Sequence, residues 1–385
     1  MPDGTSLVRP SVAVLFGASG RAQPASGAVR SLEALAEALA DRFDLALLAS
    51  ARVLAEPMPG VRRIPLAADG PRWGPLRQGL RAGRFDLWHL NSLFDRETTL
   101  PALALRRTGL VPRAPVVLSP RGECAPGALA QKPRAKRAYL AALRRSGLLD
   151  GVWLHATGPG EREEIAALRL PARGILEAPD TARLPPAPQD LGEPRGASGP
   201  LRIVFLGRIA PVKNLVFALD ALARVTAPAV FDMVGPVACA RHKAACDAAI
   251  ARLPRHVRAA WKAPIPPDDV HSFLAGYDVF LMPSLSENHG HAIAEALAAG
   301  LPVLTSDRTP WRGLAAARAG WDLPLDEPRR FAAALDRFAA LPPAARKLWR
   351  QGARRLAETR FAEANAAAAT AEMFRRAIAG ARAVQ

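Results

Sequence analysis

Short apolar runs alternate with helical patterns along the first half of the chain. Runs typical of buried strands lie at residues 12–16, 45–48, 86–90, 115–118 and 152–155. Between them, helix-forming stretches predict helices at residues 28–40, 98–107 and 135–145. Strands separated by helices of this length predict a parallel sheet with helices on both faces.

The same alternation restarts after a break at residues 184–200 that is rich in Pro, Gly and Ser. The strands predicted beyond it lie at residues 201–206, 230–234, 279–282 and 301–305, with a helix at 214–225 and helices from 328 to the end. A stretch of this composition between two alternating regions is typical of an interdomain linker.

The length of 385 residues suits two α/β cores better than one. We therefore predict an α/β fold with two doubly wound Rossmann-like domains facing each other across a cleft. The predicted parts are an N-terminal Rossmann-like domain at 1–183, the linker at 184–200, a C-terminal Rossmann-like domain at 201–360 and a C-terminal helix at 361–385. We expect that last helix to pack back on the N-terminal domain.

Composition adds a formal net charge of +17, which indicates an anionic partner. Basic residues are dispersed and aromatic residues make up only 6% of the chain, so a nucleic-acid-binding surface is disfavoured. The apolar runs are too short for a transmembrane helix, and the N-terminus lacks the apolar core of a secretory signal. We therefore expect a cytoplasmic protein.

The three cysteines, Cys124, Cys239 and Cys246, are too few for a disulfide framework. Cys239, His242 and Cys246 are spaced to share one helical face. A zinc site there lacks a fourth ligand nearby, so a plain helix face is the favoured interpretation and no metal is predicted.

The densest basic stretch is KPRAKRAYLAALRR at Lys132–Arg145. It predicts an amphipathic helix with Tyr139, Leu140 and Leu143 on an apolar side. Such a helix suits peripheral contact with an anionic membrane. A solvated surface helix is an equally good interpretation.

The stretch FLMPSLSENHGHAIAEALAAGLPVLTSD at residues 280–307 predicts a strand, a polar loop, a helix and a second strand. Gly290 comes just before the helix, whose unpaired N–H groups and partial positive charge suit a phosphate. Glu287 in the loop and Glu295 in the helix offer acceptors for hydroxyl groups. This combination predicts a sugar nucleotide as ligand, and two solvated acids are the alternative.

A second motif, LGRIAPVKN at Leu206–Asn214, directly follows the first strand of the second domain. Gly207 permits close backbone approach, Arg208 offers a planar fork and Lys213 a point charge. Together the two cations can neutralise a diphosphate leaving group. Loop residues that merely face solvent are the alternative, but the position after a strand favours the functional interpretation.

Motifs of the first domain also follow predicted strands. In LSPRGECAPGAL, Arg121 and Glu123 are expected to point into the cleft. Gly27 lies at a predicted helix start, which again suits a phosphate. The sequence GASG at residues 17–20 lacks the third glycine of a dinucleotide-binding loop and is discounted.

Two of these segments together resemble the C-terminal signature of the retaining glycosyltransferases of family 4, which have the GT-B fold. The segments are GRIAPVKN and, further along the chain, SENHGHAIAEALAAGLPVLTSD. The segments NSLFD, SPRGECAPGAL, HATGPGE, DRTPWRGL and AGWDLPLD resemble one bacterial branch that is often found in surface polysaccharide assembly. The resemblance runs over most of the chain.

The resemblance implies roles for the matching positions. Arg208 and Lys213 would bind the donor diphosphate, Glu287 would face the donor sugar hydroxyls, Glu295 would hold the ribose hydroxyls and Gly27 would lie near the donor phosphates. The residues implied as catalytic are Arg208, Lys213 and Glu287, and those implied as donor-binding are Gly27, Arg121, Gly207, Asn288, His289, Gly290 and Glu295.

Three positions depart from the family pattern. Many relatives carry His before Gly where this chain has Arg121–Gly122, and that His contacts the donor sugar. Many relatives have Asn where Asp180 follows Pro179. Only one glycine follows Ser26, where relatives often have two.

The resemblance therefore implies transfer of a hexose from a nucleotide diphosphate sugar to an acceptor hydroxyl with retention of configuration. A UDP-sugar is favoured and GDP-mannose is second. The acceptor would be a glycan or lipid-linked glycan in surface polysaccharide or lipopolysaccharide synthesis, bound by the N-terminal domain. No cofactor or metal is expected, since cationic side chains replace it. A sugar-nucleotide 2-epimerase of the same fold is the alternative, and a basic nucleic-acid-binding protein is a more distant one.

Overall fold

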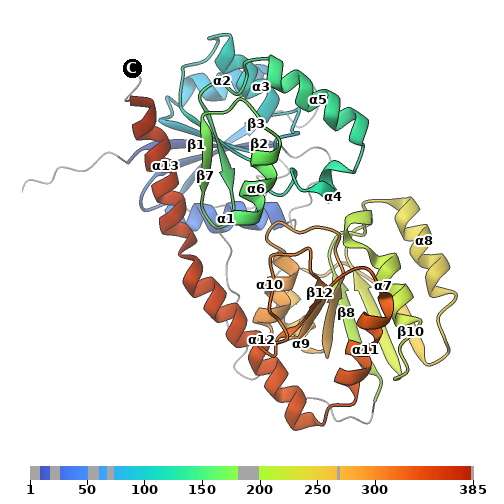
Figure 1. Cartoon of the computed structure of the whole chain (residues 1–385). Helices are drawn as coiled ribbons and strands as arrows, with labels where there is room; N and C mark the ends of the chain where they lie inside the picture. The colour runs from blue at the N-terminus through green and yellow to red at the C-terminus, as the bar shows by residue number, and fades with distance from the viewer. Residues whose placement is uncertain are drawn as a thin grey trace, which may run out of the picture. The chain divides into compact units, whose positions relative to one another are not determined.

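The computed structural model describes residues 9–17, 27–50, 60–66, 73–180, 199–266 and 269–382. These residues fall into two compact units, one within residues 1–182 and 365–385 and the other within 183–364 (Figure 1). Nearly all of the linker predicted at 184–200 lies outside the described residues.

The described part of the first unit contains a parallel sheet in the order β3-β2-β1-β4-β5-β6-β7. Its strands are β1 (Ser11–Phe16), β2 (Asp44–Ser50), β3 (Val61–Leu66), β4 (Leu87–Asn91), β5 (Val116–Ser119), β6 (Val152–Ala156) and β7 (Gly174–Glu177). The hydrophobic pattern did not predict β3 and β7. Both are edge strands with exposed or half-exposed positions, so neither carries the apolar run of a buried strand.

Helices cover both faces of this sheet (Figure 1). They are α1 (Gly27–Leu39), α2 (Trp73–Ala82), α3 (Thr99–Arg107), α4 (Pro126–Leu129), α5 (Pro133–Arg145), α6 (Pro159–Ala167) and α13 (Ala366–Arg382). Successive residues of β1 enter different cores, since side chains alternate across a strand. Ala13 and Leu15 join the core with α2, α3, α5 and α6, whereas Val14 and Phe16 join the core with α1 and α13.

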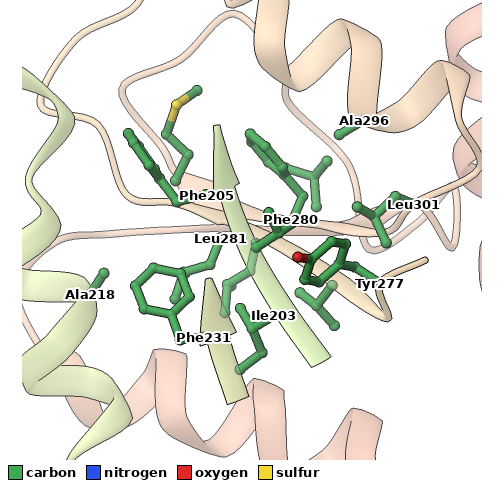
Figure 2. Close-up of a cluster of buried hydrophobic side chains, with 14 of the residues drawn as sticks. Ile203, Phe205, Ala218, Phe231, Tyr277, Phe280, Leu281, Ala296 and Leu301 are labelled. Carbon is green, nitrogen blue, oxygen red and sulfur yellow. The ribbon is translucent and has the colours of Figure 1, made fainter. Parts of the chain in front are cut away.

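The second unit repeats the arrangement in the order β10-β9-β8-β11-β12-β13, again with parallel pairing. Its strands are β8 (Leu201–Leu206), β9 (Ala229–Val234), β10 (Val257–Lys262), β11 (Val279–Met282), β12 (Val303–Ser306) and β13 (Gly320–Leu323). Its helices are α7 (Leu215–Leu222), α8 (Ala240–Ile250), α9 (Val270–Ala275), α10 (His291–Ala298), α11 (Pro328–Ala339) and α12 (Pro343–Ala364). Phe205, Phe231 and Phe280 fill the core around the central strands (Figure 2).

Several arginine side chains that contribute to the large positive charge form hydrogen bonds inside this unit. Three arginines of α12 donate to carbonyl oxygens at the carboxyl ends of other helices and in the turns after them, where such groups have no partner in the helix. Arg346 donates to Ala339 O at 2.6 Å and Arg354 to Ala298 O at 2.5 Å. The net charge of +17 is therefore not only a signal of an external partner.

Both sheets have the strand order of a doubly wound fold, which confirms the predicted fold class. The order reverses between β1 and β4 in the first unit and between β8 and β11 in the second. In open parallel sheets, ligands bind beyond the carboxyl ends of the strands at such a reversal. The loops after these four strands are therefore where a site is expected.

Candidate functional site

The loops after β8 and β9 approach each other closely. A Cβ on Gly235 would lie 2.1 Å from the carbonyl oxygen of Gly207, and both glycines have positive φ angles, +139° and +156°. Only glycine fits at Gly235 without moving backbone. After β8 the chain forms a 3-10 turn at Pro211–Lys213.

That turn is joined to the loop after β11. The N–H of Leu285 donates to Val212 O at 2.8 Å, and the Lys213 Nζ lies 2.5 Å from Glu287 Oε1. The hydroxyl of Ser284 donates to the same carboxylate oxygen at 2.6 Å. The lysine and glutamate side chains are only 16% and 10% exposed. Two residues 74 positions apart thus form a largely buried ion pair at the reversal in strand order.

The base of the Glu287 loop is anchored to the neighbouring strand. Ser306 Oγ donates to Ser284 O at 2.5 Å, and Thr305 Oγ1 donates to Met282 O at 2.8 Å. These bonds hold the end of β11 against the end of β12. Glu287 is therefore presented by a fixed loop, which reduces the entropy lost when a ligand binds.

Gly290 is the last residue of this loop before α10. Its backbone is left-handed, with φ of +72°. A Cβ there would lie 3.1 Å from Trp311 Nε1, which donates to His289 O at 2.8 Å. The N-terminus of α10 therefore follows directly after the Glu287 loop. Asn288 and His289 lie half-buried in the loop, and Glu295 lies half-buried within α10.

Arg208 directly follows Gly207 at the end of β8, and its side chain is exposed. The bonds that hold Lys213 and Glu287 together do not include it. The structure thus brings Lys213, Glu287 and the start of α10 into one short segment of the sheet edge, and leaves Arg208 on the surface beside them.

In the first unit, Gly27 is the first residue of α1, as expected for a helix start. Residues 18–26, which hold the rest of the discounted GASG sequence, lie outside the described residues. The structure gives Gly17 a packing role. A Cβ on it would lie 2.1 Å from Asp95 Oδ2, and that carboxylate accepts bonds from the N–H groups of Thr98 and Thr99 at the start of α3.

Arg121 has a left-handed conformation just after β5, with φ of +52°. Its Nε donates to Asn91 Oδ1 and its Nη1 to Asp180 Oδ1, both at 2.7 Å. Asp180 also accepts from Ser31 Oγ at 3.0 Å. Sequence reasoning noted Asp180 only as a departure from the family pattern, and its pairing with Arg121 was missed.

Glu123, predicted to point into the cleft, has its carboxylate bonded to the loop after β4. Its carboxylate accepts bonds from Ser92 Oγ at 2.7 Å, Leu93 N at 2.7 Å and Phe94 N at 3.2 Å. Burial raises the pKa of Glu123 above its ordinary value. Its role is to hold the loop after β4, because backbone N–H groups in a buried loop need acceptors.

A buried hydrogen-bonded row crosses the same sheet. His155 Nε2 lies 2.9 Å from Ala178 O, Ser119 Oγ 2.6 Å from His155 Nδ1, and His89 Nε2 2.8 Å from Ser119 Oγ. A carbonyl only accepts, so the proton of His155 is assigned to Nε2, Ser119 donates to Nδ1, and His89 donates to Ser119. In this assignment His155 is neutral, and burial lowers the pKa of both rings.

The basic helix α5 has the apolar side predicted from its sequence, and that side packs on the protein. Leu140 and Leu143 are buried in the core, and Tyr139 donates to Leu93 O at 2.8 Å. The exposed face carries charged residues, among them Arg134, Arg137, Arg144 and Arg145.

No helix among the described residues is both long enough and apolar enough to cross a bilayer. Within the same residues, no group of three or more His, Cys, Asp or Glu side chains is arranged to hold a metal ion. Cys239 lies just before α8 and Cys246 is buried in the core of the second unit.

The chain is similar to known proteins in both sequence and structure. Residues 191–355 match the sequence model of the family described as Glycosyl transferases group 1. Comparison with curated protein sequences gives no match.

Several solved structures share the fold. Sucrose-phosphate synthase (tll1590) from Thermosynechococcus elongatus has a TM-score of 0.73 and 18% identity, with 97% of this chain and 100% of that chain covered. Alr3699/HepE of Anabaena, solved in complex with UDP-glucose, has a TM-score of 0.69 and 16% identity, with 97% and 100% covered. WaaG, a glycosyltransferase involved in lipopolysaccharide biosynthesis, has a TM-score of 0.64 and 15% identity, with 94% and 99% covered.

At these identities the likeness of the solved structures establishes the fold, and the match of residues 191–355 establishes the domain. The chain therefore has the GT-B fold and carries a Glycosyl transferases group 1 domain, which makes it a transferase.

Proposed function

We propose that the chain transfers a hexose from a nucleotide diphosphate sugar to an acceptor hydroxyl with retention of configuration. The observation that carries the proposal is the Lys213–Glu287 pair, which lies beside the start of α10 where the strand order reverses. A cation and a helix N-terminus suit a diphosphate, and a carboxylate suits sugar hydroxyls. A UDP-sugar is the favoured donor, in keeping with the UDP-glucose complex of HepE, and GDP-mannose is second.

In the proposed reaction, the bond between the anomeric carbon and the diphosphate oxygen breaks, and its electron pair goes to the leaving oxygen. Lys213, Arg208 and the N-terminus of α10 stabilise the growing charge. The acceptor oxygen bonds to the anomeric carbon on the same face, and its proton passes to the leaving diphosphate. No protein nucleophile is required, and the cationic groups supply the charge that a metal would otherwise provide.

The remaining assignments follow the family pattern. Glu287 accepts from donor sugar hydroxyls and Glu295 from the ribose. Gly207 allows close approach of the backbone, and the loop 288–290 presents N–H groups to the donor. The same pattern assigns Gly27 and Arg121 of the first unit to donor binding, and that unit to the acceptor, a glycan or lipid-linked glycan of a surface polysaccharide or lipopolysaccharide.

The test is a panel of UDP-, GDP- and ADP-sugars offered to the full chain. A donor that binds the native state raises the Tm, and transfer is followed as nucleoside diphosphate released with a glycan acceptor. Release that requires acceptor supports transfer, whereas conversion of the donor sugar without acceptor identifies an epimerase. Arg208→Ala and Lys213→Ala should both lose transfer while retaining the fold, and full activity in both contradicts the assignment.

The exposed basic face of α5 supports one further proposal about location. We propose a cytoplasmic protein that contacts the anionic inner face of the membrane through Lys132–Arg145, by charge rather than by inserted apolar side chains. Flotation with phosphatidylserine vesicles should be lost when Arg134 and Arg137 are replaced by Glu. Equal flotation with neutral phosphatidylcholine vesicles contradicts the proposal.

A further inference from the structure

We propose that Asp180 is a positioning residue that couples the guanidinium of Arg121 to the first turns of α1. This inference rests on the proposed function, in which Arg121 and Gly27 lie near the donor. Asp180 itself contacts protein groups and is not assigned to the donor. Its carboxylate holds both the guanidinium of Arg121 and the start of α1.

Each oxygen of the Asp180 carboxylate has a different partner. Oδ1 accepts from Arg121 Nη1 at 2.7 Å, and Oδ2 accepts from Ser31 Oγ at 3.0 Å. The Asp180 side chain is 5% exposed and that of Arg121 is 13% exposed, while Ser31 is fully buried. A charge-assisted bond with so little solvent around it is stronger than a surface ion pair.

Arg121 is also held from a second side. Its Nε donates to Asn91 Oδ1 at 2.7 Å, and Asn91 Nδ2 donates to Leu15 O at 3.1 Å. The row of contacts thus runs from β1 through the end of β4 to Arg121, and from there through Asp180 to α1. A guanidinium carries five N–H groups, and these two bonds leave the Nη2 group for ligand oxygens.

The backbone turn at Arg121 has its own support. Arg121 and Gly122 are both left-handed, with φ of +52° and +77°, a conformation that costs a residue other than glycine about 1–2 kcal/mol. The N–H of Gly122 donates to Glu161 Oε1 at 2.5 Å, and Glu161 Oε2 accepts from Thr157 N at 2.8 Å. Asp180 therefore acts on the direction of the Arg121 side chain, while Glu161 holds the turn.

Arg121 and Asp180 form a direct ion pair, with 2.7 Å between Nη1 and Oδ1. The two charges form a matched pair, since either one alone would be largely buried without its partner. This pairing predicts that the effects of replacing both residues are smaller than the product of the two single effects.

The experiment compares full-chain Asp180→Asn, Arg121→His and the double variant in the transfer assay. Asp180→Asn should raise the KM for donor about tenfold with a smaller change in kcat, because a charged hydrogen bond contributes about 1.5–3 kcal/mol. The double variant should lose no more than Arg121→His alone, because Asp180 acts through Arg121. The matched control is Asp44→Asn, because Asp44 also accepts from a serine and an arginine, Ser11 and Arg62, but is half exposed.

Losses that multiply in the double variant, or a KM unchanged in Asp180→Asn, overturn the inference. A readout independent of activity is hydrogen exchange in α1, which should quicken near Ser31 in Asp180→Asn and in Ser31→Ala but not in Asp44→Asn. Unchanged exchange also overturns it. A wild-type chain that transfers from no donor refutes the proposed function instead, and the exchange data then still decide whether Asp180 anchors α1.

Discussion

Replacing Glu287 by Gln should have opposite effects on nucleotide binding and on turnover. The substitution preserves the shape of the side chain and its bond from Ser284 but removes the charge that faces Lys213. A donor phosphate must compete with Glu287 for the Lys213 ammonium. Removing that competitor should strengthen the binding of free UDP, even though the sugar hydroxyls then face a neutral amide oxygen in place of a carboxylate.

The size of the effect follows from the geometry. At 2.5 Å, two unit charges attract by about 7 kcal/mol at an effective dielectric constant of about 20. Desolvation of two largely buried groups offsets most of this attraction, so the net coupling is a few kcal/mol. We expect free UDP to bind about tenfold more tightly, which corresponds to about 1.4 kcal/mol, and kcat to fall at least about a hundredfold. The free energy of unfolding should fall by about 2 kcal/mol, because Lys213 keeps an unpaired charge.

The assay is calorimetric titration of UDP at low salt, together with steady-state transfer. The control is Asp247→Asn, which breaks the exposed Lys243–Asp247 pair in the same unit and should change neither quantity. Weaker UDP binding in folded Glu287→Gln would falsify the competition between phosphate and carboxylate. Equal loss of binding and turnover would instead assign Glu287 a purely structural role.

Three further predictions concern stability and catalysis. Gly235→Ala places a Cβ 2.1 Å from Gly207 O, so denaturant unfolding should show a loss of at least about 2 kcal/mol, and an unchanged midpoint contradicts the packing described. Burial lowers the pKa of both His89 and His155 in the folded chain, so the unfolded chain gains protons first. Stability should therefore fall below about pH 6.5, by at most about 1.4 kcal/mol per pH unit for each histidine, and His155→Gln should flatten the curve measured by thermal unfolding between pH 7 and 5. Lys213→Met should lower kcat/KM at least about a hundredfold, and a change in KM alone would mean that Lys213 binds substrate and transition state equally.

The linear pattern was enough to predict the two doubly wound domains. Runs such as 203–206 and 279–282 are apolar throughout, as expected of strands covered on both faces, and they lie in β8 and β11. Lys213 and Glu287 were placed at the site because each follows such a strand, and parallel strands end at one edge of the sheet. These properties are local, so they can be recognised without knowing what lies beside them.

The partners of each side chain depended on strand order and loop geometry, which the linear pattern does not contain. Arg121 and Asp180 are 59 positions apart and meet only because β5 and β7 end at the same edge. The carboxylate of Glu123 binds the loop after β4, where three donors converge on it, and the linear pattern does not indicate these partners. The apolar side of α5 was predicted from its sequence, but only the structure shows that Leu140 and Leu143 pack on the core. Hydrophobic periodicity reports that a face is buried, whereas the identity of what covers that face is settled by tertiary packing.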